Sequence, residues 1–292
     1  MKLSMQTGDV VDRLGIEKGY KIIKESGFDA IDWNLDHAWK QSDLVSGNYR
    51  GKCIFEKPLD KIISHYENEL KAIKANGLEI TQAHAPFAGI LRKDPSLLDY
   101  AIEVYKGNIL YCDYIGCKNL VIHGLTLELS DDAKTQEDIH RLNMKMYSSL
   151  IPTIKNTNVT VCLENLFVGF NGVNYAGHCS YFESGKADID YLNSLSGKES
   201  FGICIDTGHA NLLHQDIRDI IYAYDKRIKC LHIHDNNGQK DEHQAPLTGT
   251  ISWMHFCQAL KAVGYTGDLS FETFNQLNMV MDFSPDLAGD WL

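Results

Sequence analysis

The sequence predicts a single closed (β/α)8 barrel, the TIM barrel fold, over residues 1–292. Eight short apolar segments of strand character alternate with helical segments along the whole chain. Strict alternation of this kind produces a parallel sheet with helices on its outside, and eight repeats suit a closed barrel of roughly 250 residues. No G-x-G-x-x-G sequence follows the first predicted strand, so an open dinucleotide-binding sheet is disfavoured.

The eight predicted strands are short apolar runs, and four of them end in a polar or charged residue. They cover residues 2–5, 30–35, 79–85, 119–124, 160–165, 201–206, 228–235 and 268–273. Helical periodicity predicts helices near residues 12–26, 58–76, 96–116, 132–156, 186–196, 211–225 and 252–263. Residues 275–292 are only weakly helical, because Pro285 interrupts the pattern, and we expect an irregular closing segment there.

Four glycines mark the boundaries between predicted helices and the strands that follow them. Each ends an amphipathic helical stretch shortly before an apolar strand begins, and they are Gly27, Gly77, Gly116 and Gly264. A residue in the left-handed conformation commonly closes a helix, and glycine adopts it without steric cost. We therefore expect positive φ angles at these positions.

Three long connections follow predicted strands. They cover residues 36–57, 166–183 and 236–251. In a parallel barrel the segments that follow the strands lie at one end, which is the end where active sites form. We expect these segments to surround the active site, and we predict neither a linker nor a second domain.

The composition limits the class of protein. Apolar residues make up 44% of the chain, and the formal net charge is −11. Such a chain lacks the basic surface that holds a nucleic-acid backbone, although a small phosphorylated compound is not excluded. The eight cysteines include no C-x-x-C pair, and the first residues lack the apolar core of a signal peptide. We therefore expect a soluble protein of the reducing cytoplasm that contacts neither nucleic acid nor membrane.

Residue types that bind metals stand at the ends of six successive predicted strands. Strand 201–206 ends at Asp206, and His209 follows three residues later. The D-T-G triplet by itself is equally well explained as a turn in which Asp206 caps the next helix. Five other strands end in a similar way, with His84, His123, Glu164, His232, His234 and Glu272. These side chains are expected to converge at one mouth of the barrel.

A metal ion would explain this convergence, because buried carboxylates and imidazoles are costly unless a cation neutralises them. The most economical set of ligands, which suits Mn²⁺, Mg²⁺, Co²⁺ or Zn²⁺, is Glu164, Asp206, His232 and Glu272. His84 and His123 also have structural explanations, as a turn residue and as a core histidine. His232 and His234 alternate on one strand and share a face, so we expect one to bind the metal and the other to form hydrogen bonds.

The motifs around these residues resemble those of the xylose isomerase-like barrels. This family includes sugar isomerases, keto-sugar 3-epimerases, inosose dehydratases and abasic-site nucleases of the endonuclease IV type. The matching segments are AHAPF, VIHG, LENL, IDTGHA, LHIHDN, HQAPLTGTISW and FETF, and the resemblance covers nearly the whole chain.

The resemblance implies one divalent metal at the four ligands named above, with Glu164 and Glu272 also moving protons. In the nuclease branch nine ligands hold three zinc ions. The residues that match them are His84, His123, Glu164, Asp206, His209, His232, Asp241, His243 and Glu272.

The leading hypothesis is a metal-dependent isomerase or epimerase that acts on a small sugar or sugar phosphate through an enediolate. The alternatives are a multinuclear zinc phosphoesterase and an inactive sugar-binding member of the fold. The acidic net charge and the absence of Lys and Arg from residues 166–183 count against a nuclease. The oligomeric state stays open, and a homo-oligomer is compatible with the fold.

Substrate contacts are predicted from aromatic and polar residues near the strand ends. Trp33, Phe87 and Phe167 are expected to lie beneath the sugar. The polar contacts are assigned to His209, His234 and Lys240. The epimerases usually carry an arginine in the loop after the seventh strand, and this chain offers only Lys240 there.

Overall fold

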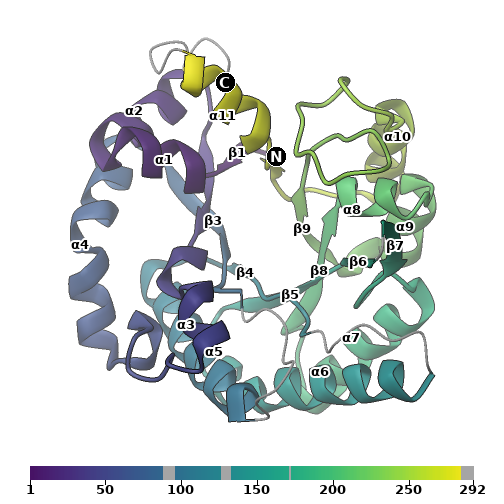
Figure 1. Ribbon diagram of the computed structural model, residues 1–292, viewed down its shortest axis with the longest axis horizontal. Coiled ribbons are helices and arrows are strands. Elements are labelled where there is room, and N and C mark those ends of the chain that lie inside the picture. The colour runs from purple at the N-terminus through teal and green to yellow at the C-terminus, as the bar shows by residue number, and fades with distance from the viewer. Residues whose placement is uncertain (88–95, 126–132, 171, 284–292) are drawn as a thin grey trace.

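The computed structural model is a closed barrel, and it describes residues 1–87, 96–125, 133–170 and 172–283. Eight parallel strands form one sheet in the order β10, β1, β2, β3, β4, β5, β8, β9. The ring closes where Ile233, directly after β9, pairs with Phe271 of β10 and its amide donates to Ser270 O over 2.8 Å. Figure 1 looks into this ring, with the helices around its outside. The predicted fold class is confirmed.

The strands agree with the predicted ones to within a few residues at their ends. They are β1 (Leu3–Gln6), β2 (Ala30–Asn34), β3 (Glu79–His84), β4 (Asn119–Val121), β5 (Thr160–Glu164), β8 (Phe201–Asp206), β9 (Ile228–His232) and β10 (Leu269–Phe271). β4, β9 and β10 are shorter than predicted and end at Val121, His232 and Phe271. His123, His234 and Glu272 therefore stand just beyond the strands, at the mouth of the barrel.

The helices surround the sheet as predicted, with differences at several ends and one additional short helix, α3 (Gln41–Ser46), inside the predicted connection 36–57. They are α1 (Gly8–Leu14), α2 (Ile16–Glu25), α3, α4 (Leu59–Ala75), α5 (Ser96–Ile115), α6 (Ala133–Ile154), α7 (Phe182–Ser196), α8 (Thr207–Leu212), α9 (Ile217–Tyr224), α10 (Trp253–Val263) and α11 (Phe274–Phe283). The helix predicted at 12–26 is divided at Gly15, whose φ is +77°. The helix predicted at 211–225 is divided into two helices, α8 and α9. α8 begins earlier than predicted, because Asp206 caps it.

The prediction of an irregular segment at residues 275–292 is wrong for the first part of that segment. Residues 274–283 form α11, which buries Leu277 and Met281 against the core. Pro285, the basis of that prediction, lies outside the described residues. In the described part of the chain, no helix combines the length and the apolar character needed to cross a lipid bilayer.

The four boundary glycines have φ angles between +65° and +99°, as predicted. Gly77 shows how such an end is built. Its amide donates to Lys74 O over 3.0 Å, and the next amide, of Leu78, donates to Ile73 O over 3.2 Å. The left-handed residue thus satisfies carbonyls of the last turn of α4 and directs the chain into β3.

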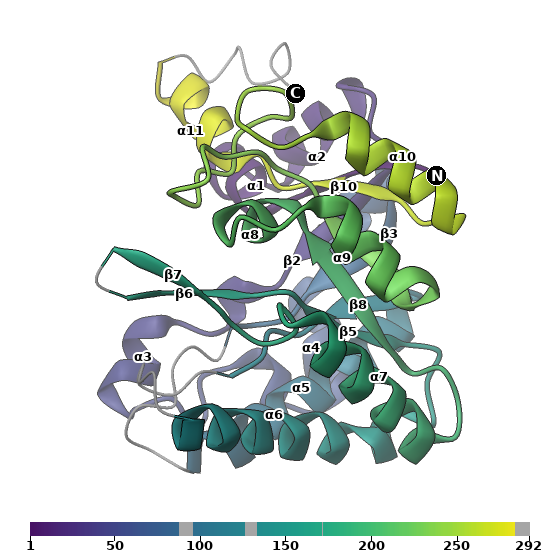
Figure 2. The same ribbon diagram turned by 90° about the vertical axis from the view of Figure 1, so that its right-hand side faces the viewer.

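A β-hairpin occupies part of the segment predicted as a loop at 166–183. Its strands β6 (Phe167–Phe170) and β7 (Val173–Ala176) are antiparallel, with Phe167 opposite Ala176. The base is tied by Leu166, whose amide donates to His178 O over 2.9 Å and whose carbonyl accepts the Ser180 hydroxyl over 2.6 Å. Figure 2 shows the hairpin projecting away from the barrel.

Small side chains fill part of the barrel interior. One buried cluster consists of Val121, Cys162, Cys204 and Cys230. Side chains alternate along a strand, so each of these thiols stands one layer beneath a predicted ligand, respectively Glu164, Asp206 and His232. All eight cysteines are free, which agrees with the expectation of no disulfide framework.

Large aromatic side chains fill the space between β2 and the helices outside it. The ring of Trp33 lies 5.3 Å from that of Tyr66 and 5.9 Å from that of Tyr111, between centroids. Its indole N–H donates to Glu69 Oε1 over 3.0 Å. Trp33 therefore belongs to the packing between the sheet and the helices.

Gly107 allows α5 to pack closely against Ile54–Glu56. A Cβ atom at this position would lie 1.8 Å from the carbonyl oxygen of Phe55. We expect Gly107→Ala to lower the free energy of unfolding by about 1–3 kcal/mol, because overpacking outweighs the ~1 kcal/mol by which alanine favours a helix. Urea unfolding measures the change. Lys106→Ala is the control and should change stability by less than about 0.5 kcal/mol; a Gly107→Ala protein as stable as wild type would contradict the packing argument.

Candidate metal centre

A cavity of about 260 Å³ opens at the mouth of the barrel, where the strands end. Eight of the nine predicted ligands line it: His84, His123, Glu164, His209, His232, Asp241, His243 and Glu272. The ninth, Asp206, lies directly behind, and its Oδ1 accepts the backbone N–H of His209 over 2.6 Å. The structure therefore brings together residues that are as far apart in the sequence as 84 and 272.

Asp206 ends β8 and also caps α8. Its Oδ1 accepts the His209 amide, and its Oδ2 lies 3.0 Å from Nε2 of His234. Burial by itself would raise the pKa of Asp206, but the neighbouring His209 and His234 hold it below its ordinary value. The interpretation of D-T-G as a helix cap is thus confirmed. An ionised, imidazole-paired carboxylate here is also what a metal ligand requires.

Glu164 lies at the centre of the imidazole cluster. Its Oε2 is 2.9 Å from Nε2 of His123 and 3.4 Å from Nδ1 of His232, and its Oε1 is 3.2 Å from Nδ1 of His209. The side chain is buried, which acts to raise its pKa, but His123 and His232 hold the pKa of Glu164 well below its usual range. Glu164 is therefore ionised at neutral pH.

Three histidines direct the same ring nitrogen toward the cavity. Their Nδ1 atoms face backbone carbonyl oxygens, His84 at 2.9 Å from Ala85 O, His209 at 3.0 Å from Asn165 O and His243 at 2.9 Å from Glu272 O. A carbonyl oxygen can only accept, so Nδ1 carries a proton in each ring, and Nε2 keeps its lone pair where the ring is neutral, as in His84. Burial acts to lower the pKa of His209, but Asp206 and Asp241 hold it well above its ordinary value, so this ring must lose its Nε2 proton to bind a metal. A ring held in this way through its second nitrogen is typical of metal-binding histidines.

His84 and His123 bring two ring nitrogens within 2.9 Å of each other, both through Nε2. Burial, and then the proximity of His123, lower the pKa of His84 to about 4, so this ring is neutral at neutral pH. The ligand atoms of His84, His123 and Glu164 all lie within 4.8 Å of one another. Two imidazoles and a carboxylate at this spacing can hold a divalent cation such as zinc.

Asp241 and His243 come from the long segment 236–251. Asp241 Oδ2 lies 3.1 Å from Nε2 of His243 and 3.8 Å from Nε2 of His209. The His243 ring stacks on that of His234, with 3.8 Å between centroids, and on Phe274 at 4.1 Å. Asp241, His243 and His234 form a second group of ligand atoms within 4.8 Å of one another. The loop after the seventh barrel strand thus contributes ligand-type groups, as predicted.

Four carboxylates are buried together around His232, namely Asp32, Glu164, Asp206 and Glu272, each at most 7% exposed. Burial first, and then the charges of Glu164 and Asp206, raise the pKa of Glu272 to about 7. Burial would lower the pKa of His232, but Glu272 and Glu164 hold it well above its ordinary value. Oδ1 of Asp32 and Oδ1 of Asp241 have no hydrogen-bond partner. This surplus of buried carboxylate, with unpartnered oxygens, fits a divalent cation.

The structure corrects three predicted substrate contacts. Trp33 is 1% exposed and lies outside the ring of strands, because on β2 it is Asp32 and not Trp33 that faces the interior. Lys240 is exposed and is not among the residues that line the cavity. His234 is fully buried behind the cavity, where it contacts Asp206. His234 therefore has the hydrogen-bonding role that was expected for one of the two histidines His232 and His234.

Two aromatic residues lie where they were expected, near the cavity. Phe87 lines it, and the ring of Phe167 is 5.1 Å from that of His209. The backbone N–H of Phe87 donates to Oδ1 of Asp36 over 2.6 Å, and this contact holds the turn after β3 at the mouth.

Sequence reasoning missed several residues of this region, among them Asp32, Asp36 and Asn34. Asp36 and Asn34 line the cavity, and Asp32 lies beneath it next to His232. The signal for Asp32 is its setting, a carboxylate in the middle of the apolar strand AIDWN. A charged residue at such a position is rarely buried without a partner.

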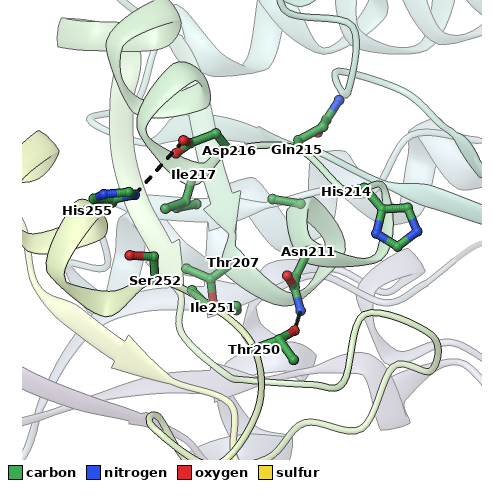
Figure 3. A pocket seen from close by; sticks show the side chains of 11 residues that line it. Thr207, Asn211, His214, Gln215, Asp216, Ile217, Thr250, Ile251, Ser252 and His255 are labelled. Carbon is green, nitrogen blue, oxygen red and sulfur yellow. Dashed lines mark hydrogen bonds and ion pairs between the residues drawn. The ribbon is translucent and has the colours of Figure 1, made fainter.

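A second polar cavity, of about 290 Å³, lies on the other side of α8 (Figure 3). Its side chains pair with one another, since Asn211 Nδ2 donates to Thr250 Oγ1 over 2.8 Å and His255 Nδ1 lies 4.0 Å from Asp216 Oδ2. Its described lining includes none of the nine predicted ligands. The barrel mouth is therefore the stronger candidate for the active site.

Similarity to known proteins extends over most of the chain. A model of the xylose isomerase-like TIM barrel family matches residues 20–288. The chain belongs to this family. It is 27% identical over 274 residues to y4fM, an uncharacterised protein of Sinorhizobium fredii, which covers 89% of this chain and 81% of y4fM. It is 29% identical over 209 residues to a probable endonuclease 4 of Ureaplasma parvum, which covers 65% of this chain and 63% of that protein.

The fold is shared with solved structures of low sequence identity. The crystal structure of a D-tagatose 3-epimerase-like protein has a TM-score of 0.64, with 99% of each chain covered and 19% sequence identity. This similarity shows that the chain has the same barrel fold. The chemistry must be argued from its own site.

The raised pKa of Glu272 predicts how the stability of the metal-free protein depends on pH. The folded state binds this proton more tightly than the unfolded state, so the contribution to stability is full below about pH 4.5 and is lost as pH rises through about 7. We expect Glu272→Gln to remove this loss. In urea unfolding, the wild type should lose up to roughly 3 kcal/mol relative to the variant between pH 4.5 and 8. A difference that stays constant with pH would contradict the raised pKa.

Gly208 makes room for the imidazole of His234. A Cβ atom at this position would lie 1.9 Å from Cε1 of that ring. We expect Gly208→Ala to displace His234 from Asp206 and to weaken divalent-metal binding by about tenfold or more, as measured by calorimetric titration. Gly169→Ala in the hairpin is the matched control, because its Cβ would approach no atom closer than 3.7 Å. Equal metal affinity in both variants would contradict the argument.

Proposed function

We propose that the protein is a divalent-metal-dependent isomerase or epimerase of a small polyhydroxylated carbonyl compound. The observation that carries this proposal is the placement of two glutamates at one cavity. Glu164 Oε2 lies 3.4 Å from Nδ1 of His232, and Glu272 Oε1 lies 3.5 Å from Nε2 of the same ring. Two carboxylates on either side of one imidazole suit the removal of a proton on one side of a substrate and its return on another.

The two glutamates have unlike environments. The pKa of Glu164 is held well below its usual range by His123 and His232 despite burial, whereas burial raises that of Glu272 to about 7. Carboxylates whose pKa values are separated in this way supply a base and an acid at the same pH. In the metal-free site, Glu164 is thus suited to accept the proton from the carbon next to a carbonyl, and Glu272 to deliver one; a bound cation would favour the ionised form of both.

A bound divalent cation would supply Lewis-acid charge that polarises the carbonyl. The residues that would hold it are Glu164, Asp206, His232 and Glu272. Loss of the proton converts the substrate to an enediolate. Return of a proton to the opposite face gives the epimer, and return to the neighbouring carbon gives the isomer.

The lining of the cavity favours an uncharged substrate. It contains the carboxylates of Asp9, Asp36 and Asp241 and the amides of Gln6 and Asn34, with no lysine or arginine among the described lining residues. Amides and carboxylates can bind sugar hydroxyls, whereas a phosphate group would be repelled. The D-tagatose 3-epimerase-like protein that shares this fold is named for a free sugar.

The ligand set gives specific support to a second candidate, a multinuclear zinc phosphoesterase. Nine ligand-type residues converge, and three of the histidines hold Nε2 toward the cavity. Metal clusters of this kind activate water for phosphoester hydrolysis. Similarity to a probable endonuclease 4 is consistent with it, whereas the net charge of −11 opposes the binding of a DNA backbone.

Proton exchange with solvent tests the leading proposal. In D₂O, the metal-loaded wild type should incorporate deuterium at the carbon next to the carbonyl of a keto-sugar, as followed by nuclear magnetic resonance. Glu164→Gln and Glu272→Gln should each slow this exchange by about 10²–10⁴-fold, the usual contribution of a general acid or base. Glu79→Gln, at the far end of the barrel from the cavity, is the control.

Metal content separates the two candidates. One ion per chain, together with exchange that depends on both glutamates, supports the isomerase. Three zinc ions per chain, cleavage of a phosphodiester and no exchange of any keto-sugar proton would reject it in favour of the phosphoesterase.

A further inference from the structure

His232 differs from the other histidines of the site in the partner that holds its ring. His84, His209 and His243 each turn Nδ1 to a backbone carbonyl and thereby direct Nε2 to the cavity. His209 Nδ1 also lies 3.2 Å from Oε1 of Glu164, but His232 Nδ1 has only this carboxylate, with Oε2 at 3.4 Å, and no backbone carbonyl among its described contacts. Nε2 of His232 lies 3.5 Å from Oε1 of Glu272 and points across the barrel to a closer carboxylate on the opposite wall.

The group on that wall is Asp32, from the middle of β2. Its side chain is fully buried, and its Oδ2 lies 3.1 Å from Nε2 of His232. This separation is within hydrogen-bond range, and a modest rotation of the ring would align its N–H with the oxygen. Asp32 is not among the residues to which the family resemblance gives a role.

Gln82 fixes Asp32 in place. Its Nε2 donates to Oδ2 of Asp32 over 2.5 Å and also approaches the carbonyl oxygen of Leu231 at 3.3 Å. Leu231 directly precedes His232 on β9. The amide therefore ties Asp32 to the strand that carries the histidine.

We propose that Asp32 is a positioning residue that holds His232 in the Nε2–H tautomer, so that the Nδ1 lone pair faces the metal beside Glu164. This inference rests on the proposed metal-dependent function. A carboxylate that accepts the second ring N–H of a metal-binding histidine fixes its orientation and raises its basicity. The predicted ligands come from neighbouring parts of the ring of strands, β5, β8, β9 and the end of β10, whereas Asp32 reaches His232 from the opposite side.

An alternative is that Asp32 itself binds a metal ion. Its ligand atom lies within 4.8 Å of those of His232 and Glu272. The two roles predict different behaviour of an asparagine. Oδ2 of Asp32 faces both neighbours while Oδ1 has no partner, so an amide oxygen in the Oδ2 position preserves both contacts. Asparagine should therefore replace a positioning carboxylate much better than it replaces a charged ligand.

The experiment measures two quantities separately, the metal affinity and the ring nitrogen of His232 that carries the proton. Calorimetric titration with Mn²⁺ and Zn²⁺ should show a loss of about 10–100-fold for Asp32→Ala and a clearly smaller loss for Asp32→Asn. Long-range ¹H–¹⁵N spectra of the zinc-loaded wild type should show His232 with a proton on Nε2 and the metal on Nδ1. Glu69→Gln is the matched control, because Glu69 contacts β2 from the outside through Trp33 and should leave metal affinity unchanged.

Three results would overturn the proposal. They are an Asp32→Ala protein within about twofold of wild-type affinity, an asparagine variant as weak as the alanine variant, and a wild-type spectrum with the metal on Nε2 of His232. If Asp32→Ala does not fold, the asparagine variant and the wild-type spectrum still decide. A wild type that binds neither ion overturns the proposed function as well, whereas normal binding that is indifferent to Asp32 overturns only this inference.

Discussion

Repulsion among buried carboxylates is the constraint on which the mouth of this barrel depends. Asp32, Glu164, Asp206 and Glu272 are almost completely removed from water, and such a group of like charges is stable only beside opposite charge. Imidazoles supply part of it, and His123 and His232 hold the pKa of Glu164 well below its usual range, whereas burial still raises that of Glu272 to about 7. The cap of α8, the backbone carbonyls and Gln82 each fix the position of a group in this cluster. They hold each charged or polar group where a cation can complete the balance.

The barrel and the convergence at its mouth could be predicted because they depend on local signals. Apolar runs bounded by glycine define the strands, and a carboxylate such as Glu164 at the end of a buried strand has few explanations other than a site. The orientation of side chains on β2 could not be predicted in the same way. β2 alternates regularly, but residues on both of its faces are buried, so counting alternate residues does not show that Trp33 packs outward. This depends on the neighbouring strand and on Glu69, which are distant in the sequence.

The hairpin β6–β7 escaped prediction for a different reason. Its segment is rich in Gly, Asn and aromatic residues, a composition that loops and short exposed strands share. Helix α11 was missed because the judgement depended on Pro285, which lies beyond the helix. The ligand types were predictable from the sequence, but the number of metal ions was not. The chain is similar both to a probable endonuclease 4 and to a ketose 3-epimerase, so the donor residues alone do not decide between the two chemistries.

The carbonyls that hold three of the histidines belong to the main chain, at Ala85, Asn165 and Glu272. A main-chain oxygen is present whatever side chain the residue carries. At positions 85 and 165, natural variation could therefore exchange the side chain without disturbing the imidazole, provided that the path of the backbone is kept. His232 has no such protection, because the oxygen beside its Nε2 is part of a replaceable side chain. Homologues should thus diverge freely at positions 85 and 165, while a change at position 32 would require a compensating change elsewhere.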